Sequence, residues 1–301
     1  MRLAVTGATG FVGSHLVDVA TAAGHEVAAL TRREQKSREG VTWINGDLRD
    51  RAPLERLVSG ADAVIHVAGV ITAQSTEAFE QGNVEGTLAM LAAATAGGIR
   101  RFVHVSSLAA REPKLSLYGR SKARAEELVY GSGLDWAVVR PPAVYGPGDK
   151  ETLELFRMAK LGVMLMPPKG RISVIHADDV ARLLLALAAP EAPAGVLAEP
   201  DDGKPGGWSH REFARALGAA VGTRPAIVSS PGILLRLAAR ADQLFRRDNA
   251  KLTVDRAAYF SHRNWVVEPK RAVPAGLWHP RIETSQGLKD TAAWYREAGW
   301  L

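Results

Sequence analysis

A tyrosine and a lysine four residues apart are the first candidates for chemistry in this chain of 301 residues. The segment runs Tyr118-Gly119-Arg120-Ser121-Lys122, and in a helix this spacing places both side chains on one face, one turn apart. A free tyrosine has a pKa of about 10 and is a poor base near neutrality, but a nearby ammonium, together with a positive nicotinamide ring, would stabilise tyrosinate and lower that pKa. Tyr118 could then exchange a proton with a carbonyl or hydroxyl group. The alternative is a decorated helix surface, with Lys122 paired only to Glu126.

Two serines follow a predicted strand and could take part in the same chemistry. Ser106 and Ser107 come directly after the apolar run Phe102-Val103-His104-Val105. Open α/β sheets place ligands at the carboxyl ends of their parallel strands. A serine hydroxyl there can donate a hydrogen bond to a substrate oxygen while negative charge develops on it. The alternative is an ordinary turn or cap, because serine commonly ends strands.

Strand and helix patterns alternate along the first half of the chain. Short connections between alternating strands and helices indicate right-handed crossovers and a parallel sheet. The sequence therefore predicts an α/β fold with a doubly wound parallel sheet. The expected strands span residues 2–6, 25–31, 41–44, 63–68, 101–106 and 136–140. The expected helices span residues 10–23, 53–59, 84–96 and 118–130.

The pattern changes beyond residue 140, where two proline-containing turns occur. Asp178 or Asp179 can cap a following helix, and Ser209 with Glu212 has the spacing of a capping box. The other expected elements are a helix over residues 152–161 and strands over 172–175 and 195–198. The rest of the chain is rich in Arg and Trp and has mostly helical patterns, which predicts a smaller, interleaved C-terminal lobe.

A glycine-rich loop joins the first predicted strand to the first predicted helix. It reads Thr6-Gly7-Ala8-Thr9-Gly10-Phe11-Val12-Gly13. Gly7 permits the tight turn, Gly10 lets the backbone approach a pyrophosphate, and Gly13 lets the helix pack on the strand. The amide groups at the helix N-terminus would face the phosphates. In this position the glycine trio predicts dinucleotide binding rather than a purely structural turn.

This motif assigns a role to each part of the chain. We expect a dinucleotide-binding domain over residues 1–165, to which residues 171–199 return. Residues 200–301 are expected to form a substrate-binding lobe.

Two arginines at the end of the second predicted strand bear on the choice of cofactor. NAD-binding folds usually place an acid there to hold the adenosine ribose, whereas this chain has Arg32 and Arg33. Guanidinium groups suit a 2′-phosphate, which favours NADP over NAD. The alternative is a solvated basic loop that also includes Lys36 and Arg38.

In this order, the glycine loop, the strand-end serine and Tyr-x-x-x-Lys resemble the short-chain dehydrogenase/reductase superfamily. The fuller pattern is similar to its extended branch, the NAD-dependent epimerase/dehydratase-like group with a Rossmann sheet. The resemblance covers residues 1 to about 180. Its further segments are Asp47-Leu48, His66-Val67-Ala68-Gly69, Asn83 with Gly86-Thr87, Arg140-Pro141-Pro142-Ala143-Val144-Tyr145-Gly146-Pro147-Gly148 and His176-Ala177-Asp178-Asp179-Val180.

The resemblance implies roles for particular residues. Tyr118 matches the general acid/base, and Lys122 matches the residue that lowers its pKa and holds the nicotinamide ribose. Ser107 matches the donor to the substrate oxygen, with Ser106 nearer the nicotinamide. Arg32 matches the arginine that recognises the 2′-phosphate. The cofactor-binding residues expected as a set are Thr6, Gly7, Thr9, Gly10, Phe11, Val12, Arg32, Arg33, Asp47, Leu48, Val67, Ala68, Gly69, Asn83, Ser106, Tyr118, Lys122, Pro141, Pro142 and Val144.

Two departures from the family pattern narrow the expected reaction. Leu108-Ala109 stand where sugar-nucleotide dehydratases of this branch carry an Asp-Glu pair. Ala143 stands where sugar-nucleotide epimerases and dehydratases commonly have Asn. The expected function is therefore an NADP(H)-dependent oxidoreductase of a small carbonyl or secondary alcohol, similar to dihydroflavonol reductases and 3β-hydroxysteroid dehydrogenases. The alternatives are a nucleotide-sugar epimerase with tightly bound NAD(P) and a non-catalytic NADP-binding assembly or sensor protein.

Composition limits the other classes of function. The chain has no cysteine, which excludes disulfides, iron–sulfur clusters and thiol catalysis, and no His and acid spacing predicts a metal site. The net charge is +6, but the basic residues are spread along the chain and do not indicate nucleic-acid binding. The four tryptophans beyond residue 264 are expected to pack in the protein rather than to stack on bases. A basic amphipathic segment over residues 236–251 could rest on a membrane, or it could rim the second lobe. We expect a cytoplasmic homodimer without stable membrane insertion.

Overall fold

The computed structural model describes residues 1–73, 75–167, 169–229, 259 and 262–301. Contacts divide the chain into two compact units. The first unit comprises residues 1–141, 178–200 and 270–279, and the second comprises 142–177, 201–269 and 280–301.

A seven-stranded parallel sheet forms the centre of the first unit. Its strand order is β11-β6-β5-β4-β1-β2-β3, with parallel pairing throughout. The strands are β1 (Arg2–Thr6), β2 (Glu26–Thr31), β3 (Val41–Asn45), β4 (Ala63–His66), β5 (Arg101–Val105), β6 (Asp135–Val139) and β11 (Val196–Ala198). This is the doubly wound order of a Rossmann sheet, so the predicted fold class is confirmed.

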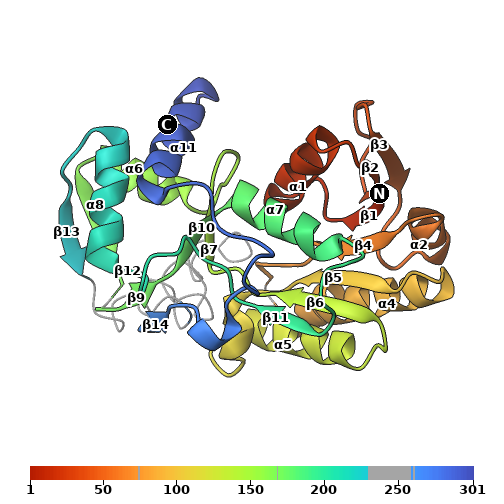
Figure 1. The fold of residues 1–301 in the computed structure, drawn as a ribbon. Coiled ribbons are helices and arrows are strands. Elements are labelled where there is room, and N and C mark those ends of the chain that lie inside the picture. Colours follow the sequence, from red (N-terminus) through yellow and green to blue (C-terminus); the bar gives the residue numbers. More distant parts are fainter. Residues whose placement is uncertain (74, 168, 230–258, 260–261) are drawn as a thin grey trace. The chain divides into compact units, whose positions relative to one another are not determined.

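Helices cover both faces of this sheet (Figure 1). Helices α1 (Phe11–Ala22) and α7 (Ala177–Ala188) lie on one face, and α2 (Arg51–Val58), α4 (Gly86–Ala96) and α5 (Leu117–Tyr130) lie on the other. Because both faces are covered, the central strands are apolar on both sides. All four residues of β4 and all five of β5 are buried.

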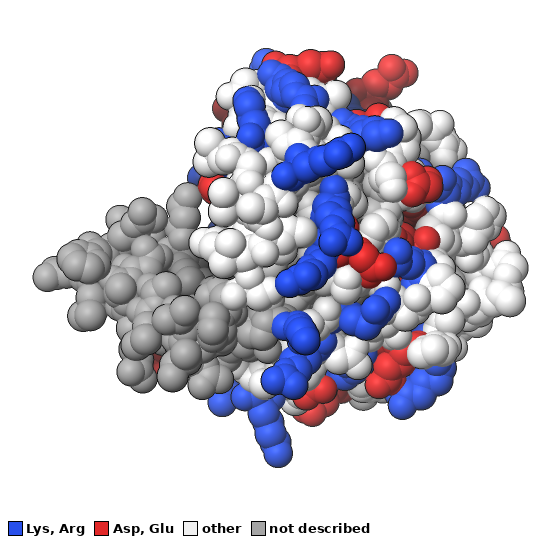
Figure 2. All heavy atoms as spheres, turned by 90° about the vertical axis from the view of Figure 1, so that its left-hand side faces the viewer, with Lys and Arg blue, Asp and Glu red and all other residues white. Residues whose placement is uncertain are grey.

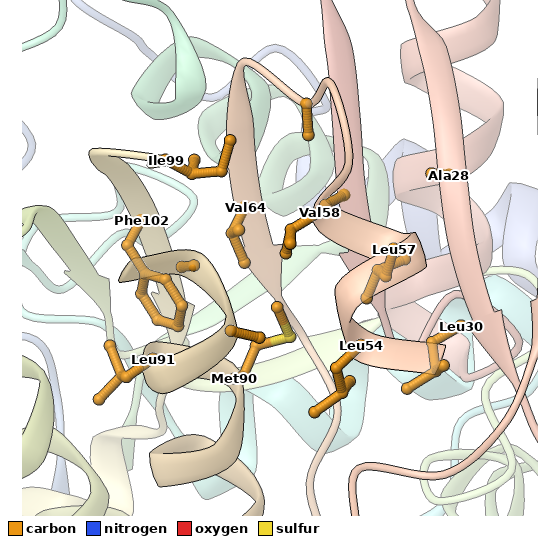
Figure 3. Packing of buried hydrophobic residues seen from close by; sticks show 14 of the residues in the cluster. Ala28, Leu30, Leu54, Leu57, Val58, Val64, Met90, Leu91, Ile99 and Phe102 are labelled. Atoms are coloured by element: carbon orange, nitrogen blue, oxygen red, sulfur yellow. The ribbon is translucent and has the colours of Figure 1, made fainter. Parts of the chain in front are cut away.

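The core on the α2, α4 and α5 side is a close-packed cluster of aliphatic and aromatic side chains. Leu54 and Leu57 of α2 and Met90 of α4 are at most 3% exposed and pack towards Val64 of β4 and Phe102 of β5 (Figure 3). Burying each such side chain stabilises the fold by about 1.5–3 kcal/mol. This core fixes the sheet whose strand ends carry the candidate site.

The second unit has its own core and three small sheets. The sheets are β10-β7, β12-β9-β14 and β13-β8. Buried side chains from helices α6, α8 and α11 form the core around Phe156, Leu217 and Tyr295. The elements are β7 (Ala143–Tyr145), α6 (Leu153–Lys160), β8 (Val163–Met166), β9 (Arg171–Ile172), β10 (Val174–His176), β12 (Trp208–Ser209), α8 (His210–Val221), β13 (Ala226–Ser229), β14 (Asn264–Trp265) and α11 (Thr284–Glu297).

Of the local features predicted beyond residue 140, one is confirmed and two differ in the structure. The capping box is confirmed, because the Ser209 side chain accepts from the Glu212 amide and Glu212 accepts in return. The expected cap at Asp178 or Asp179 is wrong, because α7 begins at Ala177 and both acids lie inside its first turn. The expected strand 172–175 is two strands, β9 and β10, separated by Ser173.

The division by contacts places residues 142–165 in the second unit and residues 270–279 in the first. These bounds differ from the expected domain limits of 165 and 200. The functional roles expected for the two parts stay predictions.

Candidate functional site

The glycine turn after β1 fits against the end of β4. Gly7 has a φ of +72°, and a Cβ there would lie 2.6 Å from the Ala68 amide nitrogen. A Cβ at Gly13, in the first turns of α1, would lie 2.0 Å from the Gly7 carbonyl oxygen. Both positions therefore require glycine, and together they hold α1 directly over the turn.

This turn lies at the point where the strand order reverses. Strand β1 pairs with β2 on one side and β4 on the other, with Thr6 opposite His66. The loops after β1 and β4 lead to opposite faces of the sheet and leave a crevice at such a switch point. Here the Ala68 amide donates to the Thr6 hydroxyl over 3.3 Å, which ties the two strand ends together.

The residues at this point fit a dinucleotide diphosphate. The first turn of α1 contains no acidic residue, and its amide groups have no acceptor within the helix. Positive partial charge at a helix N-terminus favours an anion. Thr6, Thr9, Gly10, Phe11 and Val12 lie in or next to this turn.

The expected adenosine-side residues follow β2 and β3. Arg32 and Arg33 are exposed directly after β2. The Asp47 carboxylate accepts from the Arg49 side chain over 2.8 Å and from the Arg49 amide over 3.1 Å. These bonds lower the pKa of Asp47, and the positive charge of Arg32 contributes a smaller part. Arg32 is therefore close enough to Asp47 for its charge to act on that carboxylate. Leu48 lies against α4, since a Cβ at Gly86 would be 2.8 Å from its Cδ1.

Ser107 and Tyr118 meet through two short turns. Ser107 caps the 3-10 turn Leu108–Arg111, where its hydroxyl accepts from the Ala109 amide over 3.2 Å. Ser116 caps α5 in the same way, accepting from the Gly119 amide over 2.9 Å. The two turns touch, because a Cβ at Gly119 would lie 2.6 Å from the Ala109 carbonyl oxygen. The result is a hydrogen bond between the side chains of Ser107 and Tyr118.

Lys122 is buried one turn further along α5. It is 4% exposed, and its Nζ donates to the Val105 carbonyl oxygen over 2.7 Å. The alternative of a simple Lys122–Glu126 surface pair does not hold, because Glu126 binds Arg140 instead. Burial lowers the pKa of Lys122 and the charge of Glu126 raises it. Burial has the larger effect, and the resulting pKa is about 8.

The pKa of Tyr118 differs from the sequence expectation. Burial raises this pKa above its ordinary value of 10, and the hydrogen bond from Ser107 opposes that rise. The side chains around Tyr118 therefore do not by themselves produce the expected fall in its pKa. The desolvation of a phenolate outweighs the stabilisation that the surrounding side chains give it. At neutral pH Tyr118 carries its proton.

Asn83 joins the loop after β4 to helix α5. It is 1% exposed and lies in the π-helical turn Glu80–Glu85 that leads into α4. Its Oδ1 accepts from the Val70 amide over 2.7 Å, and its Nδ2 donates to the Val70 carbonyl and to the Ser121 hydroxyl. A Cβ at Gly69 would lie 3.0 Å from Asn83 Oδ1 and 3.6 Å from Lys122 Nζ. Loop 67–70, Asn83 and Lys122 are thus neighbours, with Ser121 as a linking residue that sequence reasoning missed.

Two buried histidines lie beneath this cluster. His66 and His104 are cross-strand neighbours whose rings stack with centroids 5.5 Å apart. His66 bonds the hydroxyls of Thr6 and Thr87, and burial lowers its pKa to about 3. His104 has no hydrogen-bond partner within the described part of the chain, and burial holds its pKa well below 6.5. Both rings are neutral at pH 7.

The expected proline and valine residues after β6 divide between the two units. Pro141 belongs to the first unit, where its carbonyl accepts from the Leu108 amide beside Ser107, whereas Pro142 and Val144 belong to the second, in or beside β7. His176, also in the second unit, packs edge-on against Tyr145 with centroids 5.3 Å apart. The basic segment 236–251 lies outside the described residues.

Metal binding, membrane crossing and surface charge are the remaining features that bear on function. Among the described residues, no group of His, Asp and Glu is arranged to hold a metal ion. None of the described helices combines the length and apolar character that crossing a bilayer requires. On the side that carries α8 and β13, Lys and Arg side chains form a band with acidic side chains at several points beside it (Figure 2).

Comparison with known proteins supports the assignment of the fold and the chemistry. The family model described as NAD dependent epimerase/dehydratase family matches residues 3–196. The chain is 37% identical to a ceramide reductase of Caulobacter vibrioides, over 99% of this chain and 96% of that protein. It is 34% identical to a 4-hydroxy-2-methyl-3-oxo-4-farnesyl-3,4-dihydroquinoline-1-oxide ketoreductase of Stigmatella aurantiaca, over 68% and 69% of the two chains. A 2-alkyl-3-oxoalkanoate reductase of Stenotrophomonas maltophilia is 31% identical, over 74% and 76%.

Solved structures share the fold. The crystal structure of gox2253 has a TM-score of 0.79 at 24% identity, covering 100% of this chain and 99% of that one. A UDP-glucuronic acid 4-epimerase from Bacillus cereus, in complex with UDP-glucuronic acid and NAD, has a TM-score of 0.77 at 16% identity, covering 99% and 100%. The chain belongs to the NAD-dependent epimerase/dehydratase family, within the extended short-chain dehydrogenases/reductases, and is an NAD(P)-dependent oxidoreductase acting on a carbonyl or alcohol.

Proposed function

We propose that the protein is an NADP(H)-dependent reductase that converts a ketone on a long-chain, lipid-like molecule to a secondary alcohol. The observation that carries the proposal is the hydrogen bond between Ser107 and Tyr118, with Lys122 buried one turn along the same helix. These groups lie at the carboxyl end of β5, where sheets of this type take their ligands.

The protonation states suit reduction. The nicotinamide cofactor supplies hydride to a carbonyl carbon when bound. Ser107 donates a hydrogen bond to the carbonyl oxygen as negative charge develops there. Tyr118, whose raised pKa keeps it protonated at neutral pH, gives its proton to that oxygen and completes the alcohol. The Lys122 ammonium donates to the Val105 carbonyl oxygen. Its positive charge therefore lies near the turn of α5 that contains Tyr118.

The preference for NADP over NAD rests on the end of β2. Arg32 and Arg33 follow this strand with their side chains exposed, and the nearby Asp47 carboxylate is already bonded by Arg49. Guanidinium groups bind a 2′-phosphate, whereas a free carboxylate would be needed to bind the ribose hydroxyls of NAD.

The substrate class rests on the relatives. All three are named as reductases, and the molecules in their names are a ceramide, a 2-alkyl-3-oxoalkanoate and a farnesyl-bearing 3-oxo-quinoline, of which the last two carry an oxo group. The first of these relatives matches along almost its whole length. We therefore place a ketone beside a long alkyl chain over Tyr118.

An NADPH-oxidation assay over three kinds of compound tests the function. The panel holds the 3-keto form of a ceramide, a 2-alkyl-3-oxoalkanoate and UDP-glucose, with Tyr118→Phe as the inactive control. We expect NADPH consumption with at least one long-chain ketone, and loss of it in the variant.

The alternatives give different results in the same assay. A nucleotide-sugar epimerase would convert UDP-glucose without consuming NADPH and would carry NAD(P) through purification. A non-catalytic NADP-binding protein would bind NADPH and leave the whole panel unchanged. Either result would overturn the proposed reductase.

We also propose a homodimer formed through α4 and α5. Leu88 on α4 is 54% exposed and Tyr130 at the end of α5 is 38% exposed, which are large apolar surfaces for neighbouring helices. Light scattering after size exclusion should give twice the mass of one chain for the wild-type protein and the mass of one chain for Leu88→Glu. A wild-type mass equal to that of one chain would contradict the proposed dimer. The expected cytoplasmic location stays a prediction.

A further inference from the structure

A carboxylate that the proposed chemistry does not use is fully engaged beneath the serine turn. Glu126 lies one helical turn beyond Lys122 and is 1% exposed. Its Oε1 accepts from the Ser106 hydroxyl and, over 2.8 Å, from Arg140 Nε. Its Oε2 accepts from Arg140 Nη2 over 2.6 Å and from the Tyr130 hydroxyl over 3.0 Å. Two oxygens with four donors leave Glu126 one fixed orientation.

The ionic network continues to the other end of the same turn. Arg140 also contacts the buried Glu199 over 3.4 Å, and Glu199 contacts Arg111 over 3.7 Å. Arg111 ends the 3-10 turn that Ser107 begins. The segment between Ser106 and Arg111 is thus held at both ends by side chains of one network. Its backbone is held as well, since the Leu108 amide donates to the Pro141 carbonyl over 3.0 Å.

Stability alone is a poor reason for this arrangement. Desolvating two charges can cost as much free energy as their attraction returns, and apolar residues of similar volume often replace such pairs without loss. A buried, hydrogen-bonded charge is instead well suited to fix the geometry of the groups it contacts. The group it contacts here is Ser106, the neighbour of Ser107.

The charge of Glu126 also reaches the lysine. Burial lowers the pKa of Lys122, and the Glu126 carboxylate opposes this effect. The other titratable groups near Lys122 are Tyr118 on the same helix, His66 on β4 and His104 on β5. Both histidines are neutral at pH 7, and Tyr118 is protonated, so none of the three supplies negative charge.

We propose that Glu126 is a positioning residue of the reductase site, acting through two neighbours. It holds the Ser106-Ser107 turn against α5, so that Ser107 meets Tyr118, and it places a negative charge one turn from Lys122. This inference rests on the proposed function for its kinetic part only.

The test uses Glu126→Gln, which keeps the shape of the side chain and removes its charge. Ser106→Ala removes only the hydroxyl contact. Asp135→Asn is the matched control, because Asp135 forms an equally two-pronged pair with Arg100, over 3.0 and 3.0 Å, on the exposed end of β6. Each protein is assayed for kcat, KM and NADPH binding, and Lys122 is titrated by NMR on carbon-13 lysine, with its signal assigned from Lys122→Arg.

We expect kcat to fall by about 10- to 100-fold in Glu126→Gln and in Ser106→Ala, because the reacting groups are misplaced rather than lost. NADPH affinity should stay close to wild type in Glu126→Gln. The titration midpoint of Lys122 should move down in Glu126→Gln and stay in place in Ser106→Ala. Because the two residues act through one contact, the double variant should lose less than the product of the two single losses. Asp135→Asn should match the wild type throughout.

An unchanged kcat together with an unchanged Lys122 midpoint in Glu126→Gln would overturn the inference. If that variant fails to fold, Ser106→Ala decides: a wild-type kcat there overturns the positioning role. A wild-type protein that reduces no ketone would contradict the proposed function instead. The Lys122 titration would then still show whether the charge of Glu126 acts on the pKa of Lys122.

Discussion

The side chains of Ser107 and Tyr118 are hydrogen-bonded, although one follows a strand and the other lies in a helix. Ser107 caps the 3-10 turn that follows β5, and Ser116 caps the first turn of α5, in which Tyr118 lies. The two turns are in contact at Gly119, and this contact brings the two side chains together. The two hydroxyl groups to which we assign proton donation and polarisation of the carbonyl therefore already lie together in the folded chain.

Replacing Tyr118 by phenylalanine should reduce ketone turnover by about 10²–10⁴-fold, because positioned proton transfer contributes that much to rate. NADPH affinity should stay near wild type, since the phenol hydroxyl is lost but the ring that packs on Phe79 is kept. Steady-state kinetics and NADPH titration measure the two effects.

Tyr295→Phe is the matched control for this substitution. Tyr295 is also buried and also hydrogen-bonded, but it lies in the second unit, where its hydroxyl donates to the Asp149 carbonyl. This variant should keep its turnover. Retained turnover in Tyr118→Phe would remove the tyrosine from the mechanism.

The parts of the site that depend on local sequence could be predicted. A glycine turn, a strand-end serine and a helical spacing of four are each encoded within a few residues. The positions of Gly7, Ser107, Tyr118 and Lys122 after β1, after β5 and on α5 could therefore be predicted, whereas their chemical roles stay predictions. The strand and helix alternation also sufficed for the parallel sheet, because crossover handedness and short connections leave few arrangements.

The parts that depend on long-range contacts could not be predicted. Glu126 and Arg140 look like ordinary charged residues in the sequence, and their pairing with Ser106 requires the end of β6 to lie beside α5. The pKa of Tyr118 depends on long-range contacts as well: spacing shows that Lys122 is near, but only the structure shows that the phenol is buried and that this burial raises its pKa.

Substituting Gly13 by alanine should abolish NADPH binding or prevent folding. A Cβ at this position would lie 2.0 Å from the Gly7 carbonyl oxygen, and both partners are backbone atoms that hold the turn at the switch point. Gly131→Ala is the control, because its Cβ would meet nothing closer than 3.6 Å. Thermal melts and NADPH titration of the two variants check this, and a Gly13→Ala protein that binds NADPH normally would contradict the geometry of the turn.

Replacing Arg32 and Arg33 together by alanine should weaken NADPH binding far more than NADH binding. A charge-assisted hydrogen bond to a phosphate contributes about 1.5–3 kcal/mol, so one such contact corresponds to roughly 10- to 100-fold in Kd. Equilibrium titrations of both cofactors measure the ratio.

Arg38→Ala serves as the control for that pair, because Arg38 is already bound to Asp18 and Thr21. It should leave the preference between the cofactors unchanged. Tighter binding of NADH than NADPH by the wild-type protein would show that the two arginines form only a solvated loop.

The pH dependence of reduction should have a limb near pH 8 that belongs to Lys122. The pKa of this lysine is about 8, and its charged form is the one that accompanies proton donation, so kcat/KM for NADPH should fall as pH rises through that value. Tyr118 cannot set this limb, because its pKa is raised above 10 and it stays protonated over the same range.

Stability should move in the opposite direction over the same window, which separates the two effects. The pKa of Lys122 is about 8 in the folded protein and 10.5 in its ordinary state, so the unfolded chain binds more protons between these values. The contribution of Lys122 to the free energy of unfolding therefore rises with pH there. A loss of activity above pH 8 thus reports the charge on the lysine and not unfolding at this residue. Lys122→Arg, whose guanidinium stays charged, should lack the limb near pH 8; an unchanged limb in that variant would assign it to another group.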